Sequence, residues 1–136
     1  MDKQRRPAWD APLAPLAASP FWLDVDDVTA GSWLFREGEP VREITWVREG
    51  IVRLVRIDSD GRATPVGLRG PGSLVGGVTA MQNDRHRLCA HTIGWTRLSR
   101  LDAARFRQIL GAPGELALRV RAALERELRA TLDDTD

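Results

Sequence analysis

Short hydrophobic segments separated by glycine-bearing turns fill the middle of the chain. The turn glycines are Gly31, Gly38, Gly50, Gly61, Gly70, Gly72 and Gly76. Between them, the alternation of apolar and polar residues predicts strands over 28–35, 44–47, 51–57, 64–68, 88–93 and 96–101. The run from Asp58 to Gly61 has the composition of a hairpin turn. Together these segments are typical of an all-β sandwich or barrel.

The spacing of apolar residues becomes helical after Asp102. Asp102 is placed to cap a first helix. That helix carries Phe106, Ile109 and Leu110, and the glycines and proline of residues 111–114 end it. A second, long helix is predicted over 114–132.

The long helix has one apolar face. Its apolar residues Leu116, Val120, Leu124, Leu128 and Leu132 lie four residues apart. A helix of this kind at the end of a β domain must pack back on its own sheet or find a partner. The small residues Ala117 and Ala123 beside the stripe permit close approach of two helices. We therefore expect a homodimer through Leu116, Val120, Leu124 and Leu128.

Residues 1–20 are rich in proline and alanine and show no sustained period, which predicts a surface arm. One domain over 21–136, including the long helix, then remains. No apolar run reaches the roughly 18–20 residues that span a bilayer, and no secretory segment stands at the N-terminus. Cys89 is the only cysteine, which fits a reducing compartment. We expect a cytoplasmic protein with no membrane contact.

The charge balance argues against a dedicated nucleic-acid binder. Lysine and arginine number 20 and aspartate and glutamate 19, giving a formal net charge of +1. Arginines gather between Arg85 and Arg107, where we expect a solvated rim. The acidic end, residues 133–136, repels phosphate. We expect no direct binding of DNA by this chain.

Several motifs in a fixed order carry a family resemblance. They are Phe35-Arg36-Glu37-Gly38-Glu39-Pro40, Asp60-Gly61-Arg62, Gly70-Pro71-Gly72 and Leu101-Asp102-Ala103-Ala104-Arg105-Phe106, followed by the long helix. In this order they resemble the cyclic nucleotide-binding domain of the catabolite activator and fumarate–nitrate regulator family of bacterial transcription factors. The resemblance implies a mainly β fold with α, a double-stranded β-helix (jelly-roll) barrel flanked by helices. It also implies a role in signalling and transcription regulation. Full members carry a DNA-reading domain after the long helix; we expect a stand-alone domain here.

The resemblance places a phosphate-binding loop at Gly76, Gly77 and Val78. In the family, backbone N–H groups at the start of a short helix receive the cyclic phosphate, an arginine grips it, and a glutamate after the loop glycine accepts from the ribose. Gly77 stands at the glutamate position, and either His86 or Arg87 stands at the arginine position, depending on a one-residue bulge. The resemblance with this incomplete set implies a non-enzymatic domain that does not bind cyclic AMP or cyclic GMP tightly. A small anionic ligand or a protein partner stays open.

Other functions remain as alternatives. The first alternative is a genuine cyclic nucleotide-responsive domain of a transcription regulator, and the second is a structural module without ligand. His86 and His91 with Cys89 between them give a metal site too few ligands, so we expect no metal and no cofactor. No Ser, His and Asp arrangement indicates catalysis. Trp33, Trp46 and Trp95 fall in or near predicted strands, and we expect them in the core.

Overall fold

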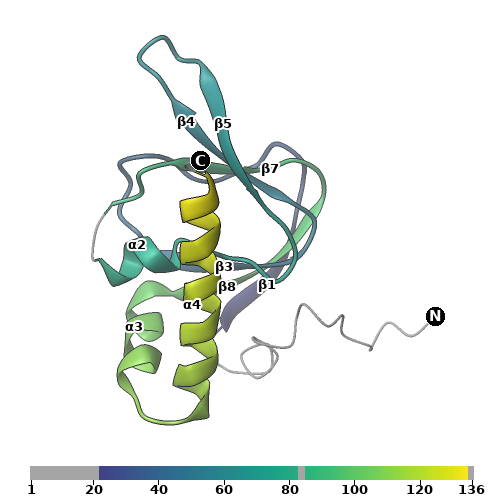
Figure 1. Cartoon of the computed structure of the whole chain (residues 1–136). Coiled ribbons are helices and arrows are strands. Elements are labelled where there is room, and N and C mark those ends of the chain that lie inside the picture. The colour runs from purple at the N-terminus through teal and green to yellow at the C-terminus, as the bar shows by residue number, and fades with distance from the viewer. Residues whose placement is uncertain (1–21, 83–84, 135–136) are drawn as a thin grey trace, which may run out of the picture.

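Two antiparallel sheets form the body of the protein in a computed structural model that describes residues 22–82 and 85–134 (Figure 1). One sheet has the strand order β1-β8-β3-β6, and the other β2-β7-β4-β5. The strands are β1 (Trp22–Val28), β2 (Trp33–Phe35), β3 (Glu43–Glu49), β4 (Val52–Ile57), β5 (Ala63–Arg69), β6 (Leu74–Val75), β7 (Cys89–Thr92) and β8 (Thr96–Asp102). The jelly-roll fold expected from the resemblance is confirmed.

The predicted strand over 28–35 is wrong, because the chain turns in its middle. β1 ends at Val28 and β2 begins at Trp33. Gly31 lies between them with a φ of +75°, a conformation that L side chains rarely adopt. The short strand β6 within the loop motif was not predicted either, since two residues are too few to show a period.

β1 was missed because its polar residues are acidic and break the expected alternation. In the fold Asp26 and Asp27 form ion pairs with arginines of the neighbouring strand β8. Nε of Arg97 lies 2.9 Å from Oδ1 of Asp27, and Nε of Arg100 lies 3.4 Å from Oδ2 of Asp26. Such cross-strand pairs stabilise an antiparallel sheet by a few tenths of a kcal/mol to about 1 kcal/mol each.

The turn and helix caps predicted from the sequence are confirmed. Oδ1 of Asp58 accepts hydrogen bonds from the backbone N–H groups of Asp60 and Arg62. Asp102 caps helix α3 (Ala103–Gly111) by accepting from the N–H groups of Ala104 and Arg105. These short local bonds satisfy donors that a turn or a helix start leaves unpaired.

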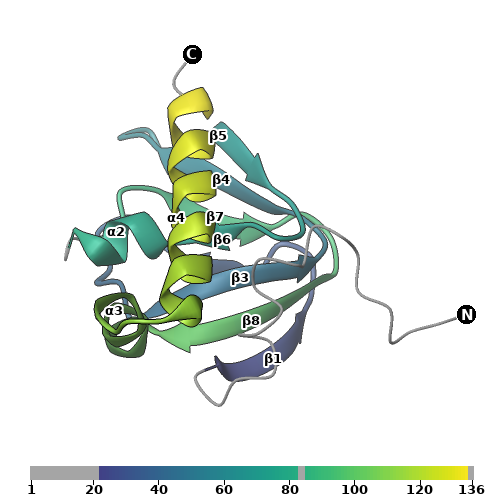
Figure 2. The same cartoon turned by 60° about the horizontal axis from the view of Figure 1, so that its bottom comes forward.

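The helices of the described residues lie on one side of the barrel (Figure 2). They are α2 (Gly77–Met81), α3 and α4 (Glu115–Asp134). Their apolar residues form one core with the outer side of the β1-β8-β3-β6 sheet, where Ile44, Trp46 and Leu101 are buried. A second cluster, with Val47, Leu54 and Leu98, fills the space between the two sheets.

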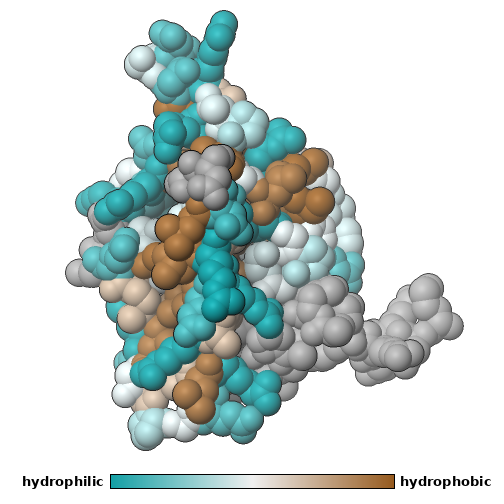
Figure 3. Space-filling view, in the orientation of Figure 1, coloured by the Kyte–Doolittle hydropathy of each residue, from teal (hydrophilic) through white to brown (hydrophobic). Residues whose placement is uncertain are grey.

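Helix α4 packs against its own domain with its apolar face. In Figure 3 hydrophobic atoms gather along the side of α4 that faces α2 and α3, and its outward side is hydrophilic. Val120 is fully buried, Leu116 and Leu124 are partly buried against the same core, and Leu128 is exposed. In the single chain this face therefore packs on its own domain, and the homodimer expected through Leu116, Val120, Leu124 and Leu128 stays a prediction.

Trp46 is a core residue as expected, but the prediction is wrong for Trp33 and Trp95, which are substantially exposed. The arm predicted over residues 1–20 lies outside the described residues. Among the helices described, none is long and apolar enough to cross a membrane.

Candidate functional site

The loop that the resemblance singled out runs from Gly72 through β6 into α2. Gly72 has a φ of +88° and Gly76 a φ of +89°, so both adopt the left-handed conformation that glycine allows. Gly76 is the residue at the start of α2, and no side chain caps the helix there from within the loop. The backbone N–H groups of residues 76–78 therefore need an acceptor from elsewhere.

Glu127 of α4 supplies that acceptor. The N–H of Gly76 donates to Oε2 of Glu127 and the N–H of Val78 donates to Oε1, both at 2.9 Å. One carboxylate thus spans the two ends of a three-residue segment, as a bound anion does in a nest of backbone amides. The loop amides that the resemblance implied as phosphate donors are bound here by a side chain of the same molecule.

Gly77 makes this contact possible. A Cβ placed at Gly77 would lie 2.8 Å from Oε1 of Glu127, 2.8 Å from Cδ2 of Leu74 and 2.9 Å from Cδ2 of Leu124. All three distances are shorter than real Cβ contacts allow, so a side chain at Gly77 would displace the ends of these three neighbouring side chains. Glycine at this position leaves room for the Glu127 carboxylate against the loop.

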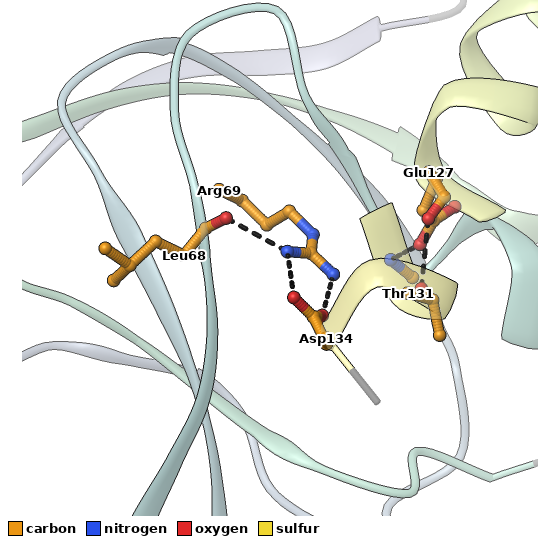
Figure 4. A network of polar contacts seen from close by, with 6 residues as sticks. Leu68, Arg69, Glu127, Thr131 and Asp134 are labelled. Carbon is orange, nitrogen blue, oxygen red and sulfur yellow. Dashed lines mark hydrogen bonds and ion pairs between the residues drawn. The ribbon is translucent and has the colours of Figure 1, made fainter. Parts of the chain in front are cut away.

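A second carboxylate of α4 binds the neighbouring strand. Asp134 forms an ion pair with Arg69 at the end of β5, and the guanidinium also donates to the carbonyl oxygen of Leu68 (Figure 4). Arg69 is 5% exposed, and a Cβ at Gly67 would lie 2.5 Å from Oδ1 of Asp134. Glu127 and Asp134 lie seven residues apart, close to two helical turns, so they share one face of α4.

The environment of Glu127 changes its protonation. Burial raises the pKa of the Glu127 carboxyl to about 7, against the opposing effects of the backbone hydrogen bonds and Arg69. The carboxyl is therefore partly protonated near neutral pH. A cavity of about 150 Å³ lies beside it, lined by residues that include Arg69, Ser73 and Arg126.

His86 and Arg87, the two candidates for the phosphate arginine, do not act together. His86 is buried and stacks on Phe35, with ring centroids 3.6 Å apart and planes 7° from parallel. Burial lowers its pKa to about 4, although Glu39 acts in the opposite direction, so the ring is neutral at pH 7. Arg87 is exposed. Neither residue offers the buried cation that grips a phosphate in the resembling family.

His86 instead lines a second cavity of about 350 Å³, together with Phe35, Arg42, Glu43 and Arg100. This cavity has charged groups of both signs, and Arg100 is already within 3.7 Å of the Glu43 carboxylate. The His86 ring also lies against the loop, because a Cβ at Gly76 would lie 3.6 Å from Cε1 of His86.

The three residues weighed as metal ligands are used otherwise. Sγ of Cys89 is buried and accepts a hydrogen bond from the N–H of Glu37, while His91 lies against Trp33. Within residues 22–82 and 85–134, no group of three or more His, Cys, Asp or Glu side chains is arranged to hold a metal ion.

Sequence reasoning missed Arg69, Glu127 and Asp134. One signal for Glu127 was available, since it falls on the apolar face of α4, seven residues after Val120 and three after Leu124. A carboxylate on the buried side of a helix needs donors to meet it. Which donors it meets depends on how α4 lies on the barrel, and the sequence does not show that.

Solved structures support the fold. The N-terminal domain of a transcriptional regulator from Streptomyces coelicolor A3(2) is 27% identical with a TM-score of 0.66, over 91% of this chain and 86% of that one. The c-di-GMP responsive global regulator CLP of Xanthomonas campestris is 18% identical with a TM-score of 0.71, over 90% of this chain and 61% of that one.

A regulatory subunit of a cAMP-independent protein kinase A from Trypanosoma brucei is 24% identical with a TM-score of 0.64; the match covers 78% of this chain and only 36% of that one. No curated protein matches the chain. The family model described as the cyclic nucleotide-binding domain matches residues 25–112. The chain belongs to the cyclic nucleotide-binding domain family.

Proposed function

We propose that this chain is a non-enzymatic regulatory domain whose phosphate-binding loop is closed by its own helix α4. In this role it does not bind cyclic AMP or cyclic GMP tightly and acts through dimerisation or contact with another protein. The observation that carries the proposal is the carboxylate of Glu127 on the N–H groups of Gly76 and Val78. A cyclic phosphate needs the same donors.

The contacts of the loop favour weak binding of cyclic nucleotides. A nucleotide must first displace Glu127, and it then finds no acceptor side chain for its ribose at Gly77. A neutral His86 stacked on Phe35 gives its phosphate no charge. Each lost hydrogen bond to a ligand costs about 1–3 kcal/mol, and about 1.4 kcal/mol is a factor of ten in affinity.

Titration calorimetry with cyclic AMP tests the proposal. The native chain is expected to bind much more weakly than about 1 μM, and Glu127→Ala to bind more tightly than the native chain because the loop donors are freed. Glu125→Ala is the matched control, since Glu125 is an exposed carboxylate on the same helix. Binding of cyclic AMP by the native chain at about 1 μM or tighter overturns the proposal.

A genuine cyclic nucleotide sensor is the second candidate. The family match and the left-handed conformations of Gly72 and Gly76 favour it, because the shape of the loop is kept. The third candidate is a structural module without ligand. A thermal-shift screen over cyclic nucleotides, cyclic dinucleotides and inorganic anions separates these candidates, since only a sensor is stabilised by one of them.

Dimerisation is the second part of the proposal. In the single chain Val120 is buried against its own core. A contact between copies would therefore use exposed leucines of the stripe on α4, of which Leu128 is 45% and Leu132 59% exposed. Light scattering of the native chain and of Leu128→Glu measures this directly. A dimer that Leu128→Glu separates supports the α4 contact, and a monomeric native chain refutes it.

A further inference from the structure

The outer face of the β2-β7-β4-β5 sheet is covered by none of the helices that the structure describes. The apolar residues of these helices pack on the other sheet, where Ile44 and Leu101 enter their core, and α4 meets β5 through the Arg69–Asp134 ion pair. On β4, Val52 and Leu54 point into the barrel core, so Ile51 and Arg53 project to the outer side. The same alternation on β7 buries Ala90 between the sheets and turns His91 outward.

One row of outward side chains crosses all four strands. Trp33 of β2 pairs with His91 of β7, His91 with Arg53 of β4, and Arg53 with Leu68 of β5. Next to this row lie Ile51 and Ile93, joined by a backbone hydrogen bond of 3.1 Å. We call these six residues the outer row.

Four of the six residues in the outer row are large and apolar, on a face where a solvated sheet normally carries polar side chains. Trp33 is 39% exposed, Ile51 and Ile93 are 41% each, and Leu68 is 58%. Antiparallel sheets with one free face usually alternate hydrophobic inside and polar outside. Exposed apolar residues grouped on one face of a sheet mark an interaction site more often than a single exposed residue does.

Trp33 is held in place before any partner arrives. The centroid of its ring lies 4.9 Å from that of the His91 ring. The guanidinium carbon of Arg36 lies 4.5 Å from the centroid of the Trp33 ring. A tryptophan fixed by neighbours loses little conformational entropy on binding, and tryptophan and arginine are the residues that most often dominate binding energy at interfaces.

The charge of the face decides the chemistry of the partner. Within residues 22–82 and 85–134, neither Arg36 nor Arg53 forms an ion pair with a carboxylate. Burial and the nearby Arg53 lower the pKa of His91, which disfavours its charged form. Two arginines beside an aromatic and aliphatic row are complementary to carboxylates that flank apolar side chains.

We infer that the outer row is a docking surface for an acidic peptide segment of another protein, with an apolar side chain against Trp33 and a carboxylate on Arg53. A nucleic acid fits less well, since it needs a basic surface and the whole chain carries a net charge of only +1. This inference is independent of the loop and of whether cyclic nucleotides bind.

Selection from a phage-displayed library of random linear peptides against the whole chain tests the inference. The expected peptides combine Asp or Glu with an aromatic or large aliphatic residue. Trp33→Ser and Arg53→Glu are each expected to weaken their binding by about tenfold or more. Arg56→Glu is the matched control, because Arg56 is an exposed arginine of the same strand outside the outer row, and it is expected to bind like the native chain.

Thermal melting of the variants shows that loss of binding is not loss of folding, since all three substituted side chains are at least partly exposed. The inference is overturned if no acidic peptides are enriched or if the selected peptides bind Trp33→Ser and Arg53→Glu unchanged. Self-association that Trp33→Ser and Arg53→Glu abolish assigns the surface to a second copy instead, and binding of single-stranded DNA that Arg53→Glu abolishes assigns it to nucleic acid. Either result also overturns it.

Discussion

Gly77 and Glu127 lie in close contact, since a Cβ at Gly77 would lie 2.8 Å from Oε1 of the carboxylate. The absence of a side chain at Gly77 removes the ribose acceptor expected at this position of the family. The bare backbone at Gly77 therefore offers no side-chain acceptor and leaves room for the Glu127 carboxylate. Gly72 and Gly76 keep the left-handed backbone of the loop, and the acceptor for its N–H groups is Glu127 of α4.

Gly77→Glu is expected to lower the free energy of unfolding by about 1–3 kcal/mol, because it crowds Leu124 and places a second carboxylate beside Glu127. Urea unfolding measures the change. Gly94→Glu is the control, since a Cβ at Gly94 meets no atom within 4 Å and the expected change there is within about 0.5 kcal/mol. Equal losses at the two sites contradict the packing of α4 on the loop.

Glu127→Ala is expected to destabilise the chain by about 1.5–3 kcal/mol, since two buried backbone donors lose a charged acceptor. Glu127→Gln keeps one acceptor oxygen and should lose less. Urea unfolding of both variants beside Glu125→Ala gives the comparison. Losses for Glu127→Ala no greater than for Glu125→Ala contradict the assignment.

The pH dependence of stability contains two opposing contributions. The pKa of Glu127 is raised from 4.5 to about 7, so the folded state holds its proton more tightly; this stability is full below about 4.5 and is lost as the pH rises through 7. The pKa of His86 is lowered from 6.5 to about 4, so the folded state disfavours its protonation; this stability is full above about 6.5 and is lost as the pH falls toward 4.

Between about pH 4.5 and 6.5 the two contributions should nearly cancel in the native chain. Single variants separate them. Stability of Glu127→Gln is expected to fall on acidification below about pH 6.5, and stability of His86→Gln to rise as the pH is lowered from 7 to 4.5. Unfolding midpoints in urea across this range measure both slopes. Identical profiles for the two variants are incompatible with the prediction.

Asp134→Ala is expected to cost about 3 kcal/mol, because it leaves the buried Arg69 without its carboxylate. The double variant Arg69→Leu, Asp134→Ala should lose less than Asp134→Ala alone, since no buried charge is then unpaired. Asp133→Ala, at an exposed neighbouring carboxylate, is the control in the same urea series. A double variant less stable than Asp134→Ala speaks against the pair.

Much of the fold follows from local pattern. Asp102 caps α3 and Asp58 closes its hairpin because both functions need only residues close in sequence. The long helix, predicted over 114–132, is observed as Glu115–Asp134. β1 escaped prediction because the arginines that neutralise Asp26 and Asp27 lie about 70 residues away, on β8.

The site was harder to predict than the fold. Gly76 and Val78 were recognised, but the carboxylate that binds them comes 51 and 49 residues later in the chain. His86 was a candidate ligand residue by alignment, and the stacking on Phe35 that takes it away from that role is a tertiary contact. Residue identity showed what the loop lacks, and only the packing of α4 shows what replaces it.

Amide hydrogen exchange at Gly76 and Val78 tests the central claim most directly. With Glu127 as the acceptor, these two amides are expected to be protected in the native chain and to exchange faster by about tenfold or more in Glu127→Ala, while Glu125→Ala leaves them unchanged. Equal protection of both amides in the native chain and in folded Glu127→Ala would contradict the closure of the loop by α4.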